Sequence, residues 1–543
     1  MSRPGAGPRR WYDLIEGPRR TDPAARRLAT RLSRRDFVRV GRDLAALIAL
    51  GTVGACRGDR GVRLASYPFP HGVASGDPGP DGAVLWTRLS AEALREAGAA
   101  GQPVPVRWEV AADDGFRRIV QSGAQMALPE LGHSVHVEVG GLDPGRPYWY
   151  RFAASGEATP SGRTVTLPAP GTAADRLRFA FASCQNYEHG FYTAYRHMAG
   201  DDLDLVLHLG DYIYERRFGN GQVRQHEAGE VYTLDEYRAR YALYRSDPDL
   251  QAAHAACPWV VTPDDHEVDN NWAGDTPEDD QLPAQFLLRR TAAFQAYYEF
   301  MPLRRSSVPT GTHIPLHRRF HCGDLADLHI LDSRQYRSDQ ACGDGRRVLC
   351  PEALVPERTM LGDEQERWLF DGLAGSSSRW NVLANQVMIA RLEGTAPDGA
   401  PLVSMDRWDG YPSAQEGLLS FLEATRPPNP VVVTGDIHSN WAADLKADFR
   451  DPTSATVGAE LVGTSITSGG DGTDVRDSTE DTLARNPHVH FFNGQRGYVR
   501  CDVTRERLAA DYRVLPYVTR PDAEAVTRAA FVVEDGRAGL QRA

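Results

Sequence analysis

Five apolar segments of this chain each run directly into acidic or polar residues, and this repeated pattern constrains the fold more than any other feature. The segments are residues 177–184, 203–211, 259–266, 328–332 and 431–436. Apolar runs of this length are typical of buried strands, and helix-like stretches such as 234–244 lie between several of them. The pattern predicts an α/β domain whose reactive side chains gather at one edge of the sheet, where the strands end.

The residues from about 70 to 168 have a different pattern, with short alternating segments and no helical period. Four such segments are separated by turn residues, and they span 83–87, 104–110, 134–139 and 148–152. This spacing is typical of an antiparallel β-sandwich, and we expect a small all-β, fibronectin-like domain here. A Pro/Gly/Thr stretch at 168–172 predicts a linker behind it.

These boundaries and the composition limit the class of protein. We divide the chain into a basic N-terminal segment at 1–56, the β-sandwich domain at 66–167, a catalytic α/β domain at 175–515 and a C-terminal tail at 516–543. The 543 residues carry 61 basic and 73 acidic side chains, a net charge of −12, which argues against nucleic-acid binding. No run of 18 apolar residues occurs beyond the N-terminal region, which argues against a polytopic membrane protein.

The N-terminal segment resembles a twin-arginine export signal. The paired arginines of Ser33-Arg34-Arg35-Asp36-Phe37-Val38 precede a weak apolar run at 44–55 that is too short to anchor permanently in a membrane. We therefore expect export by the twin-arginine translocase to the periplasm or the extracellular space, with residues 1 to about 55 removed. An amphipathic surface helix is the alternative. Val53-Gly54-Ala55-Cys56 also matches a lipobox, which makes Cys56 a candidate for a lipid anchor, and ordinary signal cleavage is the alternative there.

Export makes the state of the cysteines informative, because thiols outside the cytoplasm are paired, buried or bound to something. Cys342 and Cys350 are eight residues apart in a Gly/Arg loop, a spacing that predicts a local disulfide. No Cys-x-x-Cys pair occurs, so a structural zinc site is unsupported. The other cysteines of the mature chain are Cys184, at a strand end, and Cys257, Cys322 and Cys501, which are expected to be buried hydrophobes with their pairing left open.

Side chains that can bind metals follow four of the predicted strands. They are Cys184, Asp211, Tyr214, Asp265, His266, Asp436 and His438. Each residue alone is a weak signal, because a Gly-Asp after a strand is usually a turn and a single loop histidine is usually exposed or hydrogen-bonded. Together they supply a thiolate, a phenolate, several carboxylates and imidazoles, a hard and charge-dense set that suits a trivalent iron beside a second, divalent cation.

The same motifs resemble the PhoD form of the calcineurin-like metallophosphoesterases. The resemblance rests on Cys184, Gly210-Asp211-x-x-Tyr214, Asp264-Asp265-His266-Glu267 and Gly435-Asp436-Ile437-His438, in that order, and on the stretches 71–78, 331–337 and 359–362. It runs from about residue 71 to the 510s. Ordinary members of the superfamily carry Asp-x-His, Gly-Asn-His and Gly-His-x-His at these motifs. This chain trades imidazoles for oxygen donors, which favours calcium over zinc at the second site.

The resemblance implies a central layered β-sandwich flanked by helices. It also implies an alkaline phosphatase that hydrolyses phosphomonoesters and phosphodiesters with metal-activated water at a binuclear Fe³⁺ and Ca²⁺ centre. Cys184, Tyr214 and His438 would hold the iron, Asp211 would bridge the metals, and Asp265 and Asp436 would face the calcium. His266 would donate a proton or hydrogen bond to the leaving oxygen.

Four further polar residues are weaker candidates. Arg334 is placed to bind a phosphate through two hydrogen bonds, although an arginine after a buried strand is at least as often the partner of a nearby acid. Asn186, Asn385 and Gln386 are candidates to reach the metals or the substrate, with turn and strand-end hydrogen bonding as the alternative. We expect a monomer whose partner is a phosphate-ester substrate.

Three other functions compete with this interpretation. A dedicated phosphodiesterase acting on phospholipid or wall polymer is the first, because the same metal chemistry cleaves diesters. A non-catalytic, exported surface-binding module is the second, and the intact ligand set argues against it. A serine hydrolase would need a Gly-x-Ser-x-Gly elbow, and Gly463-Thr464-Ser465-Ile466-Thr467 fails at its last position.

Overall fold

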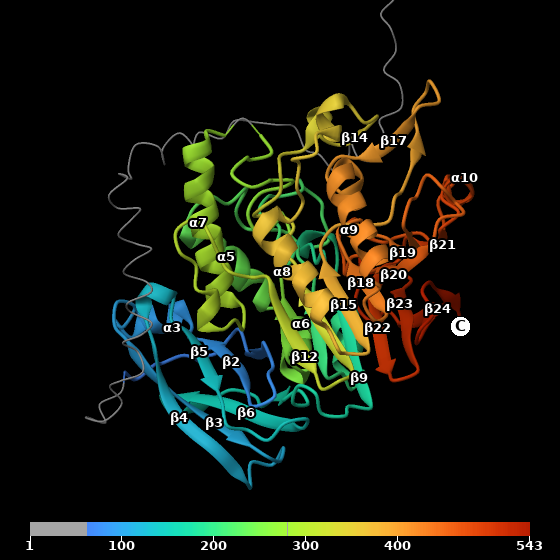
Figure 1. The fold of residues 1–543 in the computed structure, drawn as a ribbon. Coiled ribbons are helices and arrows are strands. Elements are labelled where there is room, and N and C mark those ends of the chain that lie inside the picture. The colour runs from blue at the N-terminus through green and yellow to red at the C-terminus, as the bar shows by residue number, and fades with distance from the viewer. Residues whose placement is uncertain (1–61, 280) are drawn as a thin grey trace, which may run out of the picture.

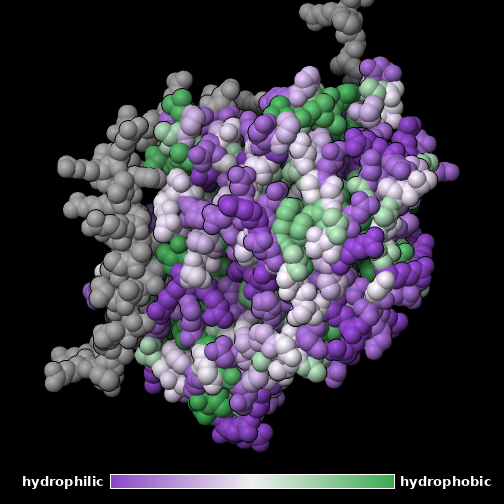
Figure 2. All heavy atoms as spheres, in the orientation of Figure 1, coloured by the Kyte–Doolittle hydropathy of each residue, from purple (hydrophilic) through white to green (hydrophobic). Residues whose placement is uncertain are grey.

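The structure is a computed structural model that describes residues 62–279 and 281–543. The predicted export signal at 1–56, including Cys56, lies outside these residues. Within the described part of the chain, no helix is both long and apolar enough to cross a membrane. On the face shown in Figure 2, hydrophilic residues predominate and hydrophobic areas are small and separate.

Two large sheets form the centre of the molecule (Figure 1). The ten-stranded sheet has the order β25 (Gln541–Arg542), β24 (Val526–Glu534), β23 (Arg507–Leu515), β22 (Arg496–Thr504), β9 (Arg176–Ala182), β10 (Leu205–His208), β11 (Trp259–Val261), β1 (Val73–Gly76), β2 (Ala83–Arg88) and β5 (Ser134–Val139). The seven-stranded sheet has the order β12 (Arg318–Cys322), β13 (Ala326–Ile330), β15 (Trp380–Asn385), β18 (Pro430–Thr434), β20 (Thr456–Val462), β19 (Asn440–Lys446) and β21 (Val489–Asn493).

Two smaller sheets complete the strands. One contains β4 (Ile119–Ala127), β3 (Val104–Ala111), β6 (Pro147–Ala154), β7 (Glu157–Ala158) and β8 (Gly162–Val165). The other contains β14 (Arg346–Arg347), β17 (Pro401–Ser404) and β16 (Gly394–Thr395).

The two large sheets share one hydrophobic core. Phe179 and Phe181 of β9 and Leu207 of β10 lie in the same buried cluster as Leu328 of β13 and Val431 of β18. Strands β9, β10 and β11 run parallel in one sheet, and β13, β15 and β18 run parallel in the other. The mixed α/β class is therefore as predicted, but the five strand segments are divided between two packed sheets and do not form one.

Helices cover the sheets on the sides away from this core (Figure 1). They are α4 (Thr193–Ala199), α5 (Leu234–Arg245), α6 (Pro248–Ala256), α7 (Pro283–Phe300), α8 (Gly362–Gly375), α9 (Pro412–Thr425) and α10 (Thr479–Arg485), whereas α3 (Ala91–Glu96) packs with the N-terminal strands. Helix α5 begins where the sequence predicts, because Thr233 and Glu236 form a capping box in which the Glu236 side chain accepts the N–H of Thr233 at 2.8 Å.

The N-terminal β-rich region, predicted to be a domain at 66–167, shares a sheet with the rest of the fold. Its strands β1, β2 and β5 continue the ten-stranded sheet, because β1 runs parallel to β11 with Gly76 opposite Trp259. A Cβ on Gly76 would lie 2.4 Å from the carbonyl oxygen of Pro302, so only glycine allows this approach. Val73 and Leu85 pack on Val106 of the smaller sheet. The region is therefore a β-sandwich in which one of the two layers is part of the ten-stranded sheet.

The C-terminal segment, predicted to be a tail at 516–543, contains two strands. Strands β24 and β25 extend the edge of the ten-stranded sheet, with Phe531 of β24 opposite Ala510 of β23. Ala529, Phe531 and Val533 alternate along β24, and all three face the core between the sheets. The end of the chain is therefore part of the catalytic fold.

Candidate metal centre and active site

Four of the predicted ligands sit in strained backbone immediately after strands. Cys184, Asp211, Asp436 and His438 have φ angles of 59°, 56°, 63° and 55°. Side chains other than glycine rarely adopt this left-handed region, and such residues persist only where the surrounding structure holds them. Four of them at neighbouring strand ends mark this edge of the two sheets as a candidate functional site.

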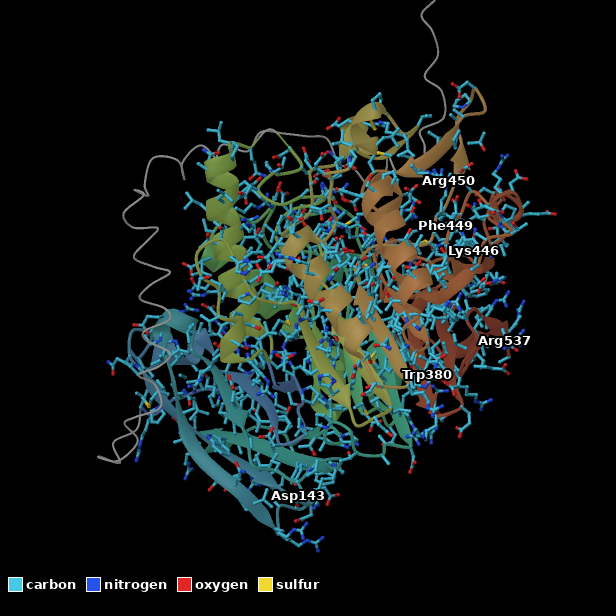
Figure 3. All side chains as sticks on the ribbon, viewed as in Figure 1. Asp143, Trp380, Lys446, Phe449, Arg450 and Arg537 are labelled. Carbon is cyan, nitrogen blue, oxygen red and sulfur yellow. A yellow bond between two sulfur atoms is a disulfide. The ribbon has the colours of Figure 1, made fainter. Side chains whose placement is uncertain are left out.

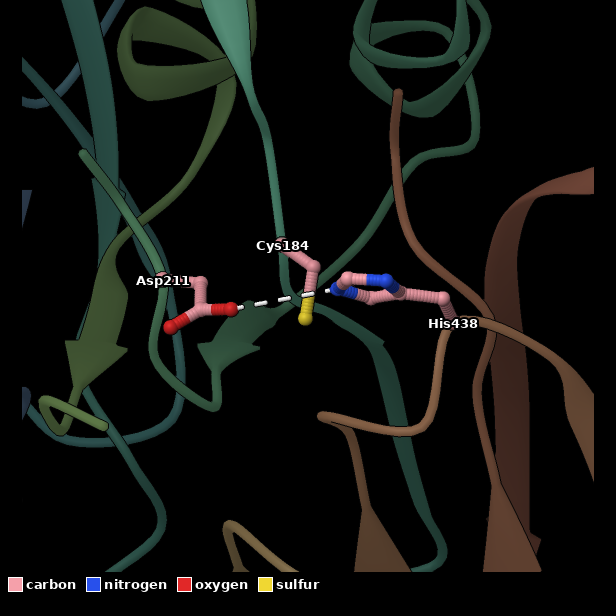
Figure 4. Close-up of side chains that lie close together, drawn as sticks. All are labelled: Cys184, Asp211 and His438. Carbon is pink, nitrogen blue, oxygen red and sulfur yellow. Dashed lines mark ion pairs between the residues drawn. The ribbon is translucent and has the colours of Figure 1, made fainter. Parts of the chain in front are cut away.

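The first group of candidate ligands is the set predicted to hold iron. Atoms of Cys184, Asp211 and His438 lie within 4.8 Å of one another and approach from three separate segments (Figure 4). The hydroxyl of Tyr214 donates to Oδ2 of Asp211 at 2.9 Å and lies 3.2 Å from Nε2 of His438. Cys184 is fully buried and forms no disulfide. The structure thus brings all four predicted residues together.

The second group consists of carboxylates. Oxygens of Asp264, Asp265 and Asp436 lie within 4.8 Å of one another. Ligand atoms of Asp211, Asp265 and His266 also lie within 4.8 Å of one another and form a further group. Asp211 therefore belongs both to the thiolate group and to the carboxylate groups, as its predicted bridging position requires. Asp264 belongs to the predicted motif but was not predicted to be a ligand.

The charged groups of this centre oppose one another when no cation is present. Burial raises the pKa of Asp211, and the neighbouring carboxylates of Asp265 and Asp264 add to this effect. Burial also raises the pKa of the Cys184 thiol, with Asp211 and Asp436 adding to the shift. Burial in turn lowers the pKa of His438, helped by the charge of Arg496. A bound cation would displace the protons of the thiol and the carboxyl, and the neutral imidazole can bind it directly.

Buried oxygen atoms without partners show that these residues fit a cation. Among the described residues, Oδ1 of Asp211, Oδ2 of Asp264 and Oδ1 of Asp265 are buried and accept no hydrogen bond. Oδ1 of Asp265 still has Nη2 of Arg334 at 3.5 Å, but the oxygens of Asp211 and Asp264 have no such neighbour, and nearly all buried polar atoms in proteins have a partner. Oδ1 of Asn385 is open in the same way, which keeps this residue as a candidate ligand.

The other two amide candidates have structural partners. The side-chain oxygen of Asn186 accepts the N–H of Glu188 at 2.9 Å and caps a short helical turn. The side-chain oxygen of Gln386 accepts the Ser333 hydroxyl at 2.7 Å. Both residues thus fill the hydrogen-bonding role that was the alternative for them.

Arg334 has carboxylate partners and no open guanidinium. It is fully buried, donates to Asp264 through Nε, and donates two hydrogen bonds to Asp406 at 2.8 and 3.1 Å. Its Nη2 is also 3.5 Å from Oδ1 of Asp265. Arg334 is therefore placed as a salt-bridge partner and not as a phosphate clamp. Its buried guanidinium neutralises the carboxylates of Asp264 and Asp406. Asp406, in the segment before α9, was missed by the sequence analysis.

Glu267 ties two strand ends together. Its carboxylate accepts the backbone N–H groups of Asp211 at 3.1 Å, Tyr212 at 2.6 Å and Asp264 at 2.9 Å. These bonds fix the strained turn after β10 relative to the segment that follows β11. Glu267 was quoted as part of a motif but given no role, although an acid three residues after Asp264 was the available signal.

Glu215 is the partner of His266. Nδ1 of His266 lies 2.6 Å from Oε2 of Glu215, and both side chains are buried. Burial alone would raise the pKa of Glu215, but the charge and hydrogen bond of His266 lower it to about 2. Burial likewise opposes the charge on His266, but Glu215 and Asp265 raise the pKa of the imidazole above its usual value. Glu215 thus favours the protonated form of His266, and sequence reasoning missed this partner.

The predicted disulfide between Cys342 and Cys350 is present, and its loop touches the site. Asp344 of this loop accepts a hydrogen bond from the side-chain amide of Asn271 at 2.8 Å. The backbone N–H of Asn271 in turn donates to Asp265 at 2.7 Å. The loop therefore supports one of the predicted calcium ligands.

The fold and this site together indicate an enzyme whose candidate metal site lies at the ends of strands from two packed sheets. The chain belongs to the PhoD-like phosphatase family. Residues 179–512 match the PhoD-like phosphatase model, and residues 55–168 match the model of the PhoD-like phosphatase N-terminal domain.

Two known proteins are similar over most of the chain. Alkaline phosphatase D of Bacillus subtilis (strain 168) is 52% identical over 522 residues, which cover 94% of this chain and 89% of that protein. A solved structure described as the structure of PhoD is 53% identical, with a TM-score of 0.86, and the match covers 88% of this chain and 93% of that chain. The predicted family is confirmed, and this protein is a phosphoric ester hydrolase.

Proposed function

We propose that the protein is an exported alkaline phosphatase that hydrolyses phosphomonoesters and phosphodiesters at a binuclear centre of Fe³⁺ and Ca²⁺. One observation carries the choice of metals. A thiolate, a phenolate and an imidazole surround Asp211 on one side, and a group made of carboxylates alone adjoins it on the other. Thiolate and phenolate suit a trivalent iron, whereas an all-oxygen group suits calcium.

The residues divide between the two cations in the same way. Cys184, Tyr214 and His438 would hold the iron, Asp211 would bridge, and Asp265 and Asp436 would face the calcium. When bound, the two cations supply Lewis acidity, which polarises a phosphoryl oxygen and lowers the pKa of a water.

The chain's own side chains perform the remaining steps. His266, protonated and held through Nδ1 by Glu215, presents its other ring nitrogen toward the group that contains Asp211 and Asp265. From there it donates a proton to the leaving oxygen of the ester. Arg334 balances the negative charges of Asp264 and Asp406, and its hydrogen bonds keep these carboxylates in place.

Metal analysis combined with selective chelation tests this function. Purified enzyme should contain iron and calcium, show a charge-transfer colour from the Tyr214 phenolate, and hydrolyse both a monoester and a diester. A calcium-selective chelator should abolish turnover and leave the colour, and Ca²⁺ should restore activity better than Zn²⁺. Turnover that survives chelation, or restoration by zinc alone, would contradict the assignment of the second site.

Cys184→Ala tests the iron site separately. The variant should lose iron, colour and turnover, because thiolate binding is part of the affinity for the metal. The buried Cys501→Ala is the matched control, since Cys501 packs in the core between the sheets, and it should keep its iron. Full iron content in the Cys184 variant would remove this cysteine from the ligand set.

Export by the twin-arginine route is tested in the full chain. Replacing Arg34 and Arg35 with lysine should trap the precursor in the cytoplasm, and undiminished export would exclude this route. Mass spectrometry of the mature N-terminus then decides between a lipid on Cys56 and ordinary cleavage.

A further inference from the structure

Phe218 lies beside three rings of the site, although it is neither a candidate ligand nor a proton donor. Its ring centroid is 4.9 Å from that of His189, 5.6 Å from Tyr214 and 6.5 Å from His266, and each pair is arranged edge to face. The Phe218 side chain is only partly buried. The guanidinium of Arg216 lies over the Phe218 ring, 5.5 Å from its centroid, so it is the remaining exposed part of the ring that can pack against a bound molecule next to the proton donor.

His189 adds a hydrogen-bond donor to the same place. Its Nδ1 accepts the backbone N–H of Gly469 at 3.0 Å, which places the ring hydrogen on Nε2. Burial, together with the charges of Arg496 and His266, lowers the pKa of His189 to about 4, so that the ring is neutral. Among the residues that the structure describes, Nε2 has no hydrogen-bond partner. An oriented N–H group is thus available beside Phe218.

One buried acid fixes these two side chains relative to each other. Glu188 and His189 share the short helical turn η3 (Tyr187–His189), and the Glu188 side chain is fully buried. Its carboxylate accepts the N–H of Phe218 at 2.6 Å and the N–H of His226 at 3.0 Å. The loop that carries Phe218 is therefore tied to the turn that carries His189, and the pair is organised before any ligand binds.

We propose that Phe218 and His189 form a leaving-group subsite that takes the ring of a ring-bearing alcohol or phenol. This inference rests on the phosphatase function proposed above, with the phosphate at the metal centre and the leaving oxygen at His266. The face of an aryl ring, or the C–H face of a sugar ring, packs on Phe218, and Nε2–H of His189 donates to an oxygen on that ring. A short polyol offers no such face, so it gains little from Phe218.

Kinetics with three substrates test the subsite. The probes are p-nitrophenyl phosphate, glucose 6-phosphate and glycerol 3-phosphate. Phe218→Ala should lower kcat/KM about 5- to 10-fold for the two ring-bearing esters and less than about 2-fold for the glycerol ester. Phe449→Ala is the control (Figure 3), because this partly buried ring contacts His488, and it should leave all three values unchanged.

His189 provides a second variant with a different readout. His189→Ala should raise KM for glucose 6-phosphate, and His189→Gln, which keeps a side-chain N–H, should recover part of the loss. Iron content and the midpoint of thermal unfolding are measured on each variant to separate folding defects from substrate effects. A loss with the aryl ester alone supports the subsite and assigns it to aromatic rings.

Equal losses on all three substrates, or no loss with either ring-bearing ester, would overturn the subsite. That outcome differs from failure of the proposed function, in which the unmodified enzyme would hydrolyse none of the three esters.

Discussion

Replacing Glu215 with glutamine tests whether this carboxylate keeps His266 protonated. Glutamine preserves the shape and can still accept the Nδ1–H of His266, which lies 2.6 Å away, but it removes the charge. His266 lowers the pKa of Glu215 from 4.5 to about 2 against the effect of burial. At about 1.4 kcal/mol per pH unit this corresponds to about 3.4 kcal/mol. Breaking a buried ion pair by removing one partner costs about 3–5 kcal/mol, which agrees.

The assay is urea unfolding of the metal-loaded enzyme together with steady-state kinetics. At pH 7 the free energy of unfolding of Glu215→Gln should be lower by about 3 kcal/mol. Because the folded-state pKa of Glu215 is lowered, its contribution is complete above pH 4.5 and is lost as the pH falls through about 2, so the difference between the proteins should shrink in acid. The value of kcat should fall about 10- to 100-fold as His266 loses its proton.

Glu299→Gln is the matched control, because Glu299 is also a buried carboxylate, and it pairs with Arg238 at 2.6 Å, away from Glu215 and His266. It should keep the kcat of the unmodified enzyme. The reasoning is refuted if Glu215→Gln unfolds within about 1 kcal/mol of the unmodified enzyme and turns over at the same rate.

Three other substitutions probe the supports of the metal centre. Arg334→Met should lower the free energy of unfolding by about 3–5 kcal/mol, since it leaves buried carboxylates unpaired, and normal thermal stability with normal calcium content would disprove this role. Replacing Cys342 and Cys350 with serine should cost about 2–3 kcal/mol and weaken calcium binding measured by titration calorimetry, whereas unchanged affinity would separate the loop from the site. Asp436→His should shift the metal that best restores activity from Ca²⁺ toward Mn²⁺ or Zn²⁺, and an unaltered preference in metal-replacement assays would contradict the oxygen-donor argument.

The strand ends could be predicted from the sequence because a buried apolar run is followed there, within a few residues, by side chains that can bind a metal. A run such as 203–209 must be buried, and Asp211 directly follows it, so the position of the ligand along the chain was visible. The local pattern did not show how the strands divide between two sheets, and only the family resemblance implied a layered sandwich. Pairing depends on partners far away in sequence, such as Gly76 with Trp259, which no local pattern records.

The residues that position the candidate ligands were harder to predict than the candidate ligands themselves. Glu215 and Glu267 are adjacent to predicted motifs, yet an acid beside a motif carries no sign of what it will contact. Asp406 lies far along the chain from Arg334, and only the folded structure shows that the two form a buried pair. For Arg334 itself, the sequence admitted both a phosphate clamp and a salt bridge, and burial decides for the salt bridge.

The order of strands in the ten-stranded sheet determines when during synthesis this metal centre can be completed. Strand β9, which leads into Cys184, pairs with β22, and Arg176 beside Asp502 joins residues 326 positions apart. Until the ribosome has released β22, that edge of β9 is unpaired and able to associate with other chains. A prematurely ended chain therefore lacks the pairing that positions the Cys184 turn, and stable metal loading would distinguish a finished polypeptide from an incomplete one.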